Sequence, residues 1–257
     1  QQADFFNQIR EAVQAQGKEH DVDIVLSDAG GDADRQVSQI QDFITKKVDA
    51  IIYIPAGATA AAVPIRDARA AGIPVVTVDR NPEDEPGDTF IATDSVSAAK
   101  DLGEWVVEET DGEGTLDEGF QEGIEGSDIV EVARQASDGW HQDEGFDIAK
   151  DMLEAHSDID IFFGRADALA LGAAQAARSA GRDDILIVGF DGDVAGLEAV
   201  RDGVLDATVT QQTQLMGQLA FDSAIKLIDG EELEAEQLQD GIVTTQENVE
   251  PFIEEHP

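Results

Sequence analysis

Four polar residues stand where apolar runs of the sequence end. Asp79 and Arg80 follow the run VVTV, Asp191 closes the run ILIVGFD, and Gln211 closes the run DATVTQ. In open α/β sheets, ligands bind outside the carboxyl ends of the strands. A carboxylate and an amide can each bond hydroxyl groups, and a guanidinium holds several donors in a fixed fork. These residues therefore suit the recognition of a small ligand rich in hydroxyl groups.

Other interpretations of these residues stay open. Asp79 and Arg80 could form a structural ion pair or cap a turn. Asp167 begins a predicted helix, and capping that helix is its favoured role. Arg165 belongs to the same region and could add a ligand contact. Trp140 lies in the polar stretch SDGWHQDEG, where an aromatic ring indicates stacking on something.

Motifs for catalysis, cofactors or metals are not found in the sequence. The four histidines do not have the spacing of a zinc site such as HExxH, and no GxSxG or GxxxxGK[ST] motif occurs. The turn AGGDAD, residues 29–34, lacks the GxGxxG spacing of a dinucleotide site. We therefore expect a protein that is not an enzyme and that needs no cofactor and no metal ion.

The charge balance is extreme. The 257 residues include 56 Asp and Glu against 16 Lys and Arg, a net charge of −40. Nucleic acids bind through cationic groups, so this charge argues against a nucleic-acid partner. Acids spread over the whole sequence are typical of a protein that works in concentrated salt, although an ordinary acidic protein is the alternative. No stretch approaches the roughly 20 apolar residues of a membrane span, so we expect no direct membrane insertion.

Apolar runs and amphipathic segments alternate along the chain and predict its elements. Helices are expected at residues 4–20, 34–47, 58–71, 95–109, around 120, 144–156, 167–180, 194–201 and 215–228. Strands are expected at residues 22–28, 49–55, 72–80, 88–92, 128–135, 158–164, 185–191, 206–212 and 241–249. A polar, glycine-rich break covers residues 110–119. This order indicates an α/β protein with parallel sheets covered by helices on both faces, arranged as two similar lobes.

Six blocks, in this order, resemble the periplasmic sugar-binding proteins of the ribose/galactose type, the solute receptors of ABC importers. They are FF at residues 5–6, VVTVDR at 75–80, IATDSVSAAK at 91–100, ADALALGAAQAARSAG at 166–181, GFDG at 189–192 and DATVTQQ at 206–212. Each block is weakly specific alone, but their shared order is more specific. The resemblance covers nearly the whole chain.

The resemblance implies two Rossmann-like lobes that enclose a sugar in a cleft and are joined by a three-segment hinge. One lobe would comprise residues 1–93 and 213–239, the other residues 94–212 and 240–257. The resemblance also implies aromatic contacts to the ligand from Phe5, Phe6 and Trp140, with Phe190 close by. Taken alone, Phe5 and Phe6 on an amphipathic helix favour core packing, and so does Phe190.

The sequence departs from the family pattern at several places. The resemblance implies a first strand in each lobe, ahead of residue 4 and after residue 115, and neither is found. Each would be a central strand, and its absence would leave backbone groups without partners. Ala166 stands where the family usually has Asn, and Ala3 where it has a polar residue.

These observations predict an extracytoplasmic, monomeric solute-binding protein that captures a monosaccharide-like ligand and delivers it to the permease of an ABC importer. One alternative is the effector-binding core of a sugar-responsive transcription regulator, which shares the fold. Another is an α/β enzyme that acts on a sugar or a nucleotide.

Overall fold

The chain folds into two compact units, each assembled from separate stretches of sequence. The computed structural model describes residues 2–110 and 118–257, so most of the predicted polar break lies outside the described residues. The N-terminal unit comprises Asn7–Thr93 and Thr213–Gln239. The C-terminal unit comprises Gln1–Phe6, Asp94–Gln212 and Asp240–Pro257. The chain therefore passes between the units within its first helix and at three later points.

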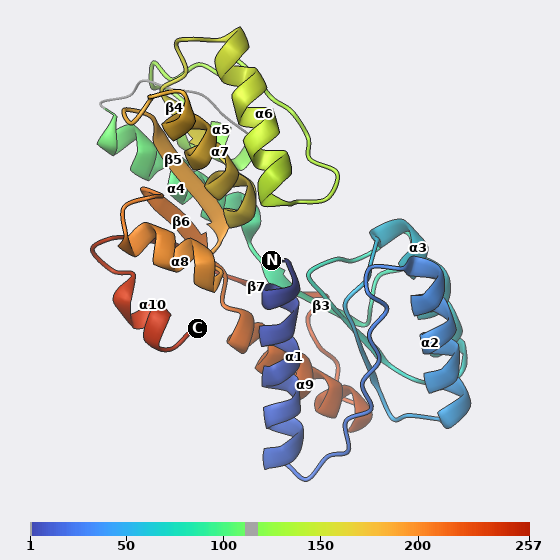
Figure 1. Cartoon of the computed structure of the whole chain (residues 1–257). Helices are drawn as coiled ribbons and strands as arrows, with labels where there is room; N and C mark the ends of the chain where they lie inside the picture. The colour runs from blue at the N-terminus through green and yellow to red at the C-terminus, as the bar shows by residue number, and fades with distance from the viewer. Residues whose placement is uncertain (1, 111–117) are drawn as a thin grey trace. The chain divides into compact units, whose positions relative to one another are not determined.

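The N-terminal unit is a parallel sheet with helices on both faces (Figure 1). Its strands, in spatial order, are β1 (Ile51–Tyr53), β2 (Val75–Val78), β3 (Thr89–Thr93) and β7 (Glu236–Gln239). Helices α2 (Ala33–Lys46) and α3 (Ala58–Ala70) share a core with β1 and β2. Helix α9 (Thr213–Ile228) also contacts the sheet, and α1 (Gln2–Glu19) runs beside it in Figure 1. Gly217 allows this approach, because a Cβ there would lie 2.5 Å from the Cβ of Ala12.

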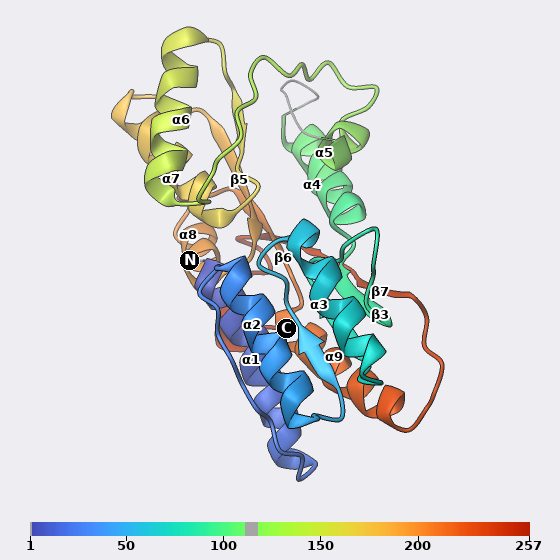
Figure 2. The same ribbon diagram turned by 90° about the vertical axis from the view of Figure 1, so that its right-hand side faces the viewer.

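The C-terminal unit repeats this plan with one reversed strand. Its strands, in spatial order, are β4 (Ile161–Phe163), β5 (Leu186–Asp191), β6 (Ala207–Thr210) and β8 (Ile242–Thr245). The pair β6–β8 is antiparallel, which the order of elements did not predict. One face carries α6 (Gln142–Ala155), α7 (Asp167–Ser179), α8 (Val194–Arg201) and α10 (Glu250–Glu254). The other carries α4 (Ser95–Glu109) and α5 (Glu118–Gly123), as Figure 2 shows on the far side of β5 from α6 and α7.

Two predicted strands are wrong. Residues 22–28 and 128–135 are extended in sequence pattern but belong to no sheet. Their apolar side chains are poorly covered: Leu26 is 52 % exposed and Val130 is 64 % exposed. An apolar run becomes a strand only when a neighbouring strand supplies hydrogen bonds, and neither segment has such a neighbour.

Each of these segments lines a cavity together with the edge strand of the nearest sheet. Residues 22–27 and residues 50–54, which include β1, line a common cavity of about 420 Å³. Residues 132–137 and residues 161–165, which include β4, line another of about 180 Å³. Both β1 and β4 are edge strands of their sheets. In each unit a cavity therefore lies where a further strand would pair with the edge.

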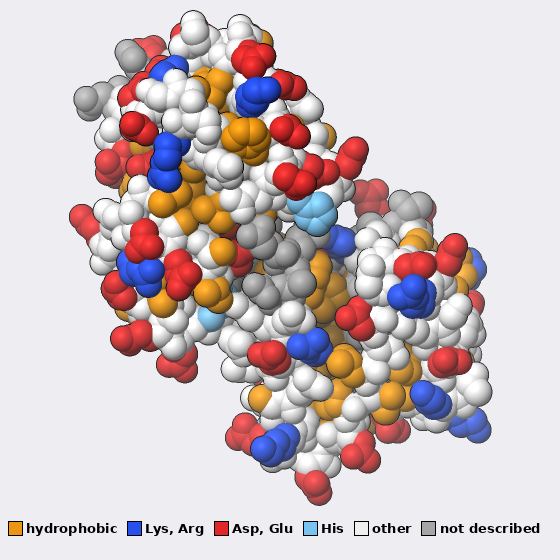
Figure 3. Space-filling model, viewed as in Figure 1, with side chains coloured by type: hydrophobic (Ala, Val, Ile, Leu, Met, Phe, Trp, Pro, Cys, Tyr) orange, Lys and Arg blue, Asp and Glu red, His pale blue; other side chains and the backbone are white. Residues whose placement is uncertain are grey.

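Acidic side chains are dispersed over the surface. Figure 3 shows Asp and Glu spread across the visible face of each unit, with few Lys or Arg between them. Several of the ion pairs join neighbours on a helix, such as Lys100–Glu104 at 3.6 Å. Such exposed pairs contribute little to stability. Since the chain has 16 Lys and Arg for 56 Asp and Glu, ion pairs leave the excess negative charge of −40 in place.

Candidate functional site

The N-terminal unit places Asp79 and Arg80 at the carboxyl end of its sheet. All four residues of β2 are buried, and the chain turns out of the sheet at Asp79, which has φ 66°. The Arg80 guanidinium lies 3.5 Å from the Asp79 carboxylate. It also donates hydrogen bonds of 3.2 Å to the carbonyl oxygens of Pro55 and Ala56, just beyond β1. The guanidinium is thus held in place from two adjacent strand ends.

Burial raises the pKa of the Asp79 carboxyl group, and the charge of Arg80 partly offsets this rise. A half-buried carboxylate beside a fixed guanidinium offers acceptors and donors side by side. This pairing matches both interpretations made from the sequence, the structural ion pair and the hydroxyl-binding pair.

The C-terminal unit places Asp191 and Gln211 at the carboxyl ends of β5 and β6. These strands are parallel neighbours, and Asp191 is in register with Thr210. The Gln211 side-chain amide donates to the Asp191 carboxylate at 2.8 Å, and its backbone N–H donates to the Asp191 carbonyl at 3.0 Å. Asp191 has φ 123°, a conformation that non-glycine residues rarely adopt. Such strain persists only where surrounding contacts fix it, and it is frequent at ligand sites.

Trp140 lies in a loop that is fixed by Glu144 at the start of α6. The Glu144 carboxylate accepts hydrogen bonds from the Ser137 hydroxyl at 2.5 Å and the Gly139 N–H at 2.9 Å. These bonds lower the pKa of Glu144, the bond from Ser137 most strongly. The Trp140 backbone has φ 60°, and its ring lies 6.0 Å from the guanidinium carbon of Arg165. The loop therefore places the Trp140 indole beside the guanidinium of Arg165, which follows β4.

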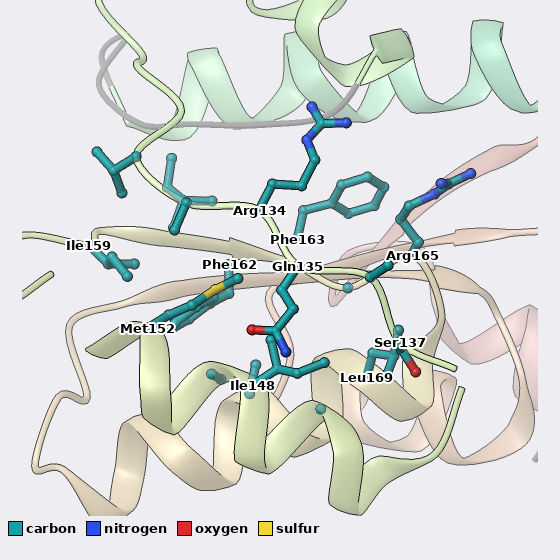
Figure 4. Close-up of a pocket in the computed structure, with 18 of the residues that line it drawn as sticks. Arg134, Gln135, Ser137, Ile148, Met152, Ile159, Phe162, Phe163, Arg165 and Leu169 are labelled. Carbon is teal, nitrogen blue, oxygen red and sulfur yellow. The ribbon is translucent and has the colours of Figure 1, made fainter. Parts of the chain in front are cut away.

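Trp140 and Arg165 both line the 180 Å³ cavity of the C-terminal unit. Figure 4 shows Arg165 among the lining residues. Its other walls are mainly apolar, with Phe162 and Phe163 pointing to opposite faces of β4 in Figure 4. Phe163 stacks on Phe120 with ring centroids 5.1 Å apart, so it is part of the core on that face. The polar lining of the cavity comes from Arg134, Gln135, Ser137 and Arg165, and the Trp140 ring lies beside Arg165.

The remaining aromatic candidates differ in exposure. The rings of Phe5 and Phe6 meet edge to face at 5.2 Å; Phe5 is 7 % exposed and Phe6 is half-buried. Phe190 is buried in the core between the sheet and α4. Phe190 therefore packs in the core, and its closeness to a ligand stays a prediction.

Asp167 does not have the role expected of it. The N-cap of α7 is Ala166, and Asp167 is the first helical residue. Its fully buried carboxylate accepts hydrogen bonds from the Asp193 N–H at 2.9 Å and the Thr208 hydroxyl at 2.5 Å. Burial, followed by the nearby charges of Asp193 and Asp191, raises the pKa of Asp167 well above its ordinary value.

One contact near Asp191 has no signal in the sequence. The His256 ring nitrogen Nε2 lies 2.7 Å from the Gly192 carbonyl oxygen, to which it can only donate. The two residues are 64 positions apart, so only the folded chain shows the contact. Among the described residues, no three His, Asp or Glu side chains form a group that could hold a metal ion. Within those same residues, no helix has the length and apolar character of a membrane span.

The fold is that of an α/β protein with two sheets, each of which carries polar side chains at the carboxyl ends of its strands. A family profile described as "Periplasmic binding protein domain" matches residues 1–117 and 115–232. The chain belongs to this periplasmic binding protein family.

Known binding proteins resemble this chain over most of its length. The chain is 29 % identical over 245 residues to the ribose import binding protein RbsB of Bacillus subtilis, a match that covers 90 % of this chain and 79 % of that protein. It is 30 % identical over 236 residues to a putative rhizopine-binding protein of Rhizobium meliloti, covering 83 % of this chain and 76 % of that protein. An ABC transporter solute-binding protein of Bacillus halodurans, solved with bound myo-inositol, has a TM-score of 0.87 at 28 % identity and covers 98 % and 93 % of the two chains.

Proposed function

We propose that this protein binds a monosaccharide or a related polyol and delivers it to the permease of an ABC importer, without transforming it. The single observation that carries the proposal is the pair of polar groups at the strand ends of each unit. These are Asp79 with Arg80, 3.5 Å apart, and Asp191 with Gln211, 2.8 Å apart. Carboxylates and fixed donors in such pairs bond adjacent hydroxyl groups and reject ligands that lack them.

The named relatives support this class of ligand. They include binding proteins for ribose and for xylitol and a structure with bound L-arabinofuranose, all small polyhydroxylated molecules. The ribose relative is an import binding protein and the arabinose-binding structure is the periplasmic component of an ABC transporter, which favours transport over the transcription-regulator alternative. Trp140, Phe5 and Phe6 would supply the aromatic faces on which the C–H groups of a sugar ring stack. Arg165, beside Trp140, would add a cation to that part of the site.

The test is a calorimetric screen of pentoses, hexoses and polyols at about 2 M KCl, a concentration that screens the acidic surface. We expect one-to-one binding of at least one compound. Arg80→Gln removes the guanidinium and should weaken that binding about 10- to 150-fold, the value of a hydrogen bond to a charged group.

Arg69→Gln is the matched control. Arg69 is similarly exposed and pairs with Asp88 at 3.2 Å, but it lies on the last turn of α3. It should bind sugar like the unchanged protein. If no compound in the panel binds to the folded protein, the proposed function is wrong. If Arg69→Gln weakens binding as much as Arg80→Gln, Arg80 is no ligand contact.

We further propose that the protein acts as a monomer outside the cytoplasm, in an environment of high salt. The family and the import receptors support the location, and the charge of −40 supports the salt. Detection of the protein in the cytoplasmic fraction of its source cells would contradict the location. Sedimentation of a dimer at micromolar concentration would contradict the monomer.

A further inference from the structure

Asp167 is a buried carboxyl group that lies beside the candidate site without being part of it. Its side chain is fully buried at the start of α7. Its hydrogen-bond donors come from distant parts of the chain, Asp193 before α8 and Thr208 in β6. Burying a carboxyl group is costly unless its hydrogen bonds are satisfied, so this position needs both donors.

The surrounding chain leaves room for this carboxyl group. A Cβ at Gly189 would lie 2.2 Å from Asp167 Oδ1, and a Cβ at Gly196 would lie 2.0 Å from Oδ2. Any larger residue at these two positions would collide with the carboxylate. Gly189 of β5 and Gly196 of α8 therefore form a compartment that fits the Asp167 carboxyl group.

The donor from Asp193 connects this compartment to the strand tip. Asp193 follows Asp191 and Gly192, which have φ values of 123° and 66°. The Asp193 side chain caps α8 through the Gly196 N–H at 2.7 Å, and its own N–H bonds to Asp167. The turn of residues 191–193 is thus held by hydrogen bonds to Asp167 at the start of α7 and to Gln211 at the end of β6.

We propose that Asp167 is a positioning residue of the ligand site: it holds the 191–193 turn in the conformation that presents Asp191 to the ligand. This inference rests on the proposed function for the identity of the ligand. Asp167 acts through the Asp193 N–H and does not touch the ligand. Thr208 orients the Asp167 carboxylate through the hydroxyl bond.

The main test is Asp167→Asn, which keeps the size of the side chain. The amide can accept from Asp193 only by turning its NH2 group toward Thr208, which reverses that hydrogen bond and leaves the Thr208 hydroxyl proton without its native acceptor. We expect sugar affinity to fall about tenfold, the value of one lost hydrogen bond. Amide exchange at the Asp193 N–H, measured by NMR without ligand, should accelerate by a similar factor.

Asp206→Asn is the matched control. Like Asp167, Asp206 accepts a hydrogen bond from a backbone N–H, here that of Ile187 near the start of β5, at 2.7 Å. This variant should keep the sugar affinity and the Asp193 exchange rate of the unchanged protein. A second pair of variants distinguishes the effect of the Thr208 hydroxyl from that of its packing. Thr208→Val, which removes the hydroxyl, should weaken sugar binding, and Thr208→Ser, which keeps it, should bind sugar like the unchanged protein.

The outcomes separate the two proposals. If the unchanged protein binds sugar but Asp167→Asn binds equally well, the positioning role is wrong and the proposed function stands. If Asp206→Asn weakens binding as much as Asp167→Asn, the effect is one of general stability and the positioning role is also wrong. If no sugar binds at all, the proposed function fails, and unchanged exchange at Asp193 in Asp167→Asn would still overturn this inference.

Discussion

The strained backbone at Asp191 gives a prediction that separates stability from binding. We compare Asp191→Gly with Asp191→Ala. Both changes remove the carboxylate and its 2.8 Å bond with Gln211, but only glycine adopts φ 123° without strain. Strain at such a residue costs about 1–3 kcal/mol, and the extra freedom of glycine in the unfolded chain offsets about 0.5–1 kcal/mol. The glycine variant should therefore be the more stable by about 1 kcal/mol.

Tryptophan fluorescence during urea unfolding is a suitable assay. The two tryptophans of the chain, Trp105 and Trp140, both lie in the C-terminal unit, so their signal reports the unit that carries Asp191. Sugar affinity should fall equally in both variants, by about 10- to 150-fold, because both lack the charged acceptor.

Asp202 provides the control, since it is exposed and has φ −84°. There the order should reverse, and Asp202→Ala should be more stable than Asp202→Gly by about 0.5–1 kcal/mol. The reasoning is refuted if Asp191→Ala equals or exceeds Asp191→Gly in stability. It is also refuted if either variant binds sugar as the unchanged protein does.

Three further predictions concern the fold. Burial raises the pKa of Tyr53 to about 12, and because it is the only tyrosine, absorbance titration should read this value directly; a midpoint near 10 would contradict it. Because the folded state keeps this proton longer than the unfolded state, stability should fall between about pH 10 and pH 12. Raising KCl from about 0.1 M to 2 M should increase the urea midpoint, since salt screens the self-repulsion of a −40 chain, and a flat response would refute this. Gly196→Ala should lower the free energy of unfolding by about 1–3 kcal/mol, because the new Cβ would lie 2.0 Å from the Asp167 carboxylate. Gly57→Ala, where the new Cβ would have nothing within 4 Å, should lower it by less than about 1 kcal/mol. Equal losses in the two variants would contradict the compartment around Asp167.

Local sequence pattern predicted most of the elements, because amphipathic helices and apolar strands carry their own periodicity. Helices α4 and α8 begin and end at the predicted residues. The pattern failed where pairing decides the outcome. Residues 22–28 and 128–135 have the composition of strands but lack a neighbour. Strand β7, with the polar sequence EQLQ, was missed because its apolar signal is weak, and it forms because β3 supplies a partner.

The residues of the candidate site likewise divide into those that local sequence pattern indicates and those that only the folded chain brings together. Asp79, Arg80 and Asp191 could be named from the sequence because each follows an apolar run that ends abruptly. The bond between Asp167 and Thr208 spans 41 residues, and that between His256 and Gly192 spans 64. Contacts over such separations depend on how the elements pack, so no local pattern reports them. The helix-start position of Asp167 pointed instead to capping, which Ala166 occupies.

The edge strands β1 and β4 also bear on how separate copies of the protein behave in solution. A sheet edge offers backbone groups on which a strand of another copy can assemble, the usual route to aggregation. Each of these edges is only three residues long, which limits such assembly. In dilute buffer, the shared negative charge keeps copies apart. Concentrated salt stabilises each molecule by screening its charge, but it also screens the repulsion between molecules. In concentrated salt, assembly at the edges is therefore limited by the shortness of β1 and β4.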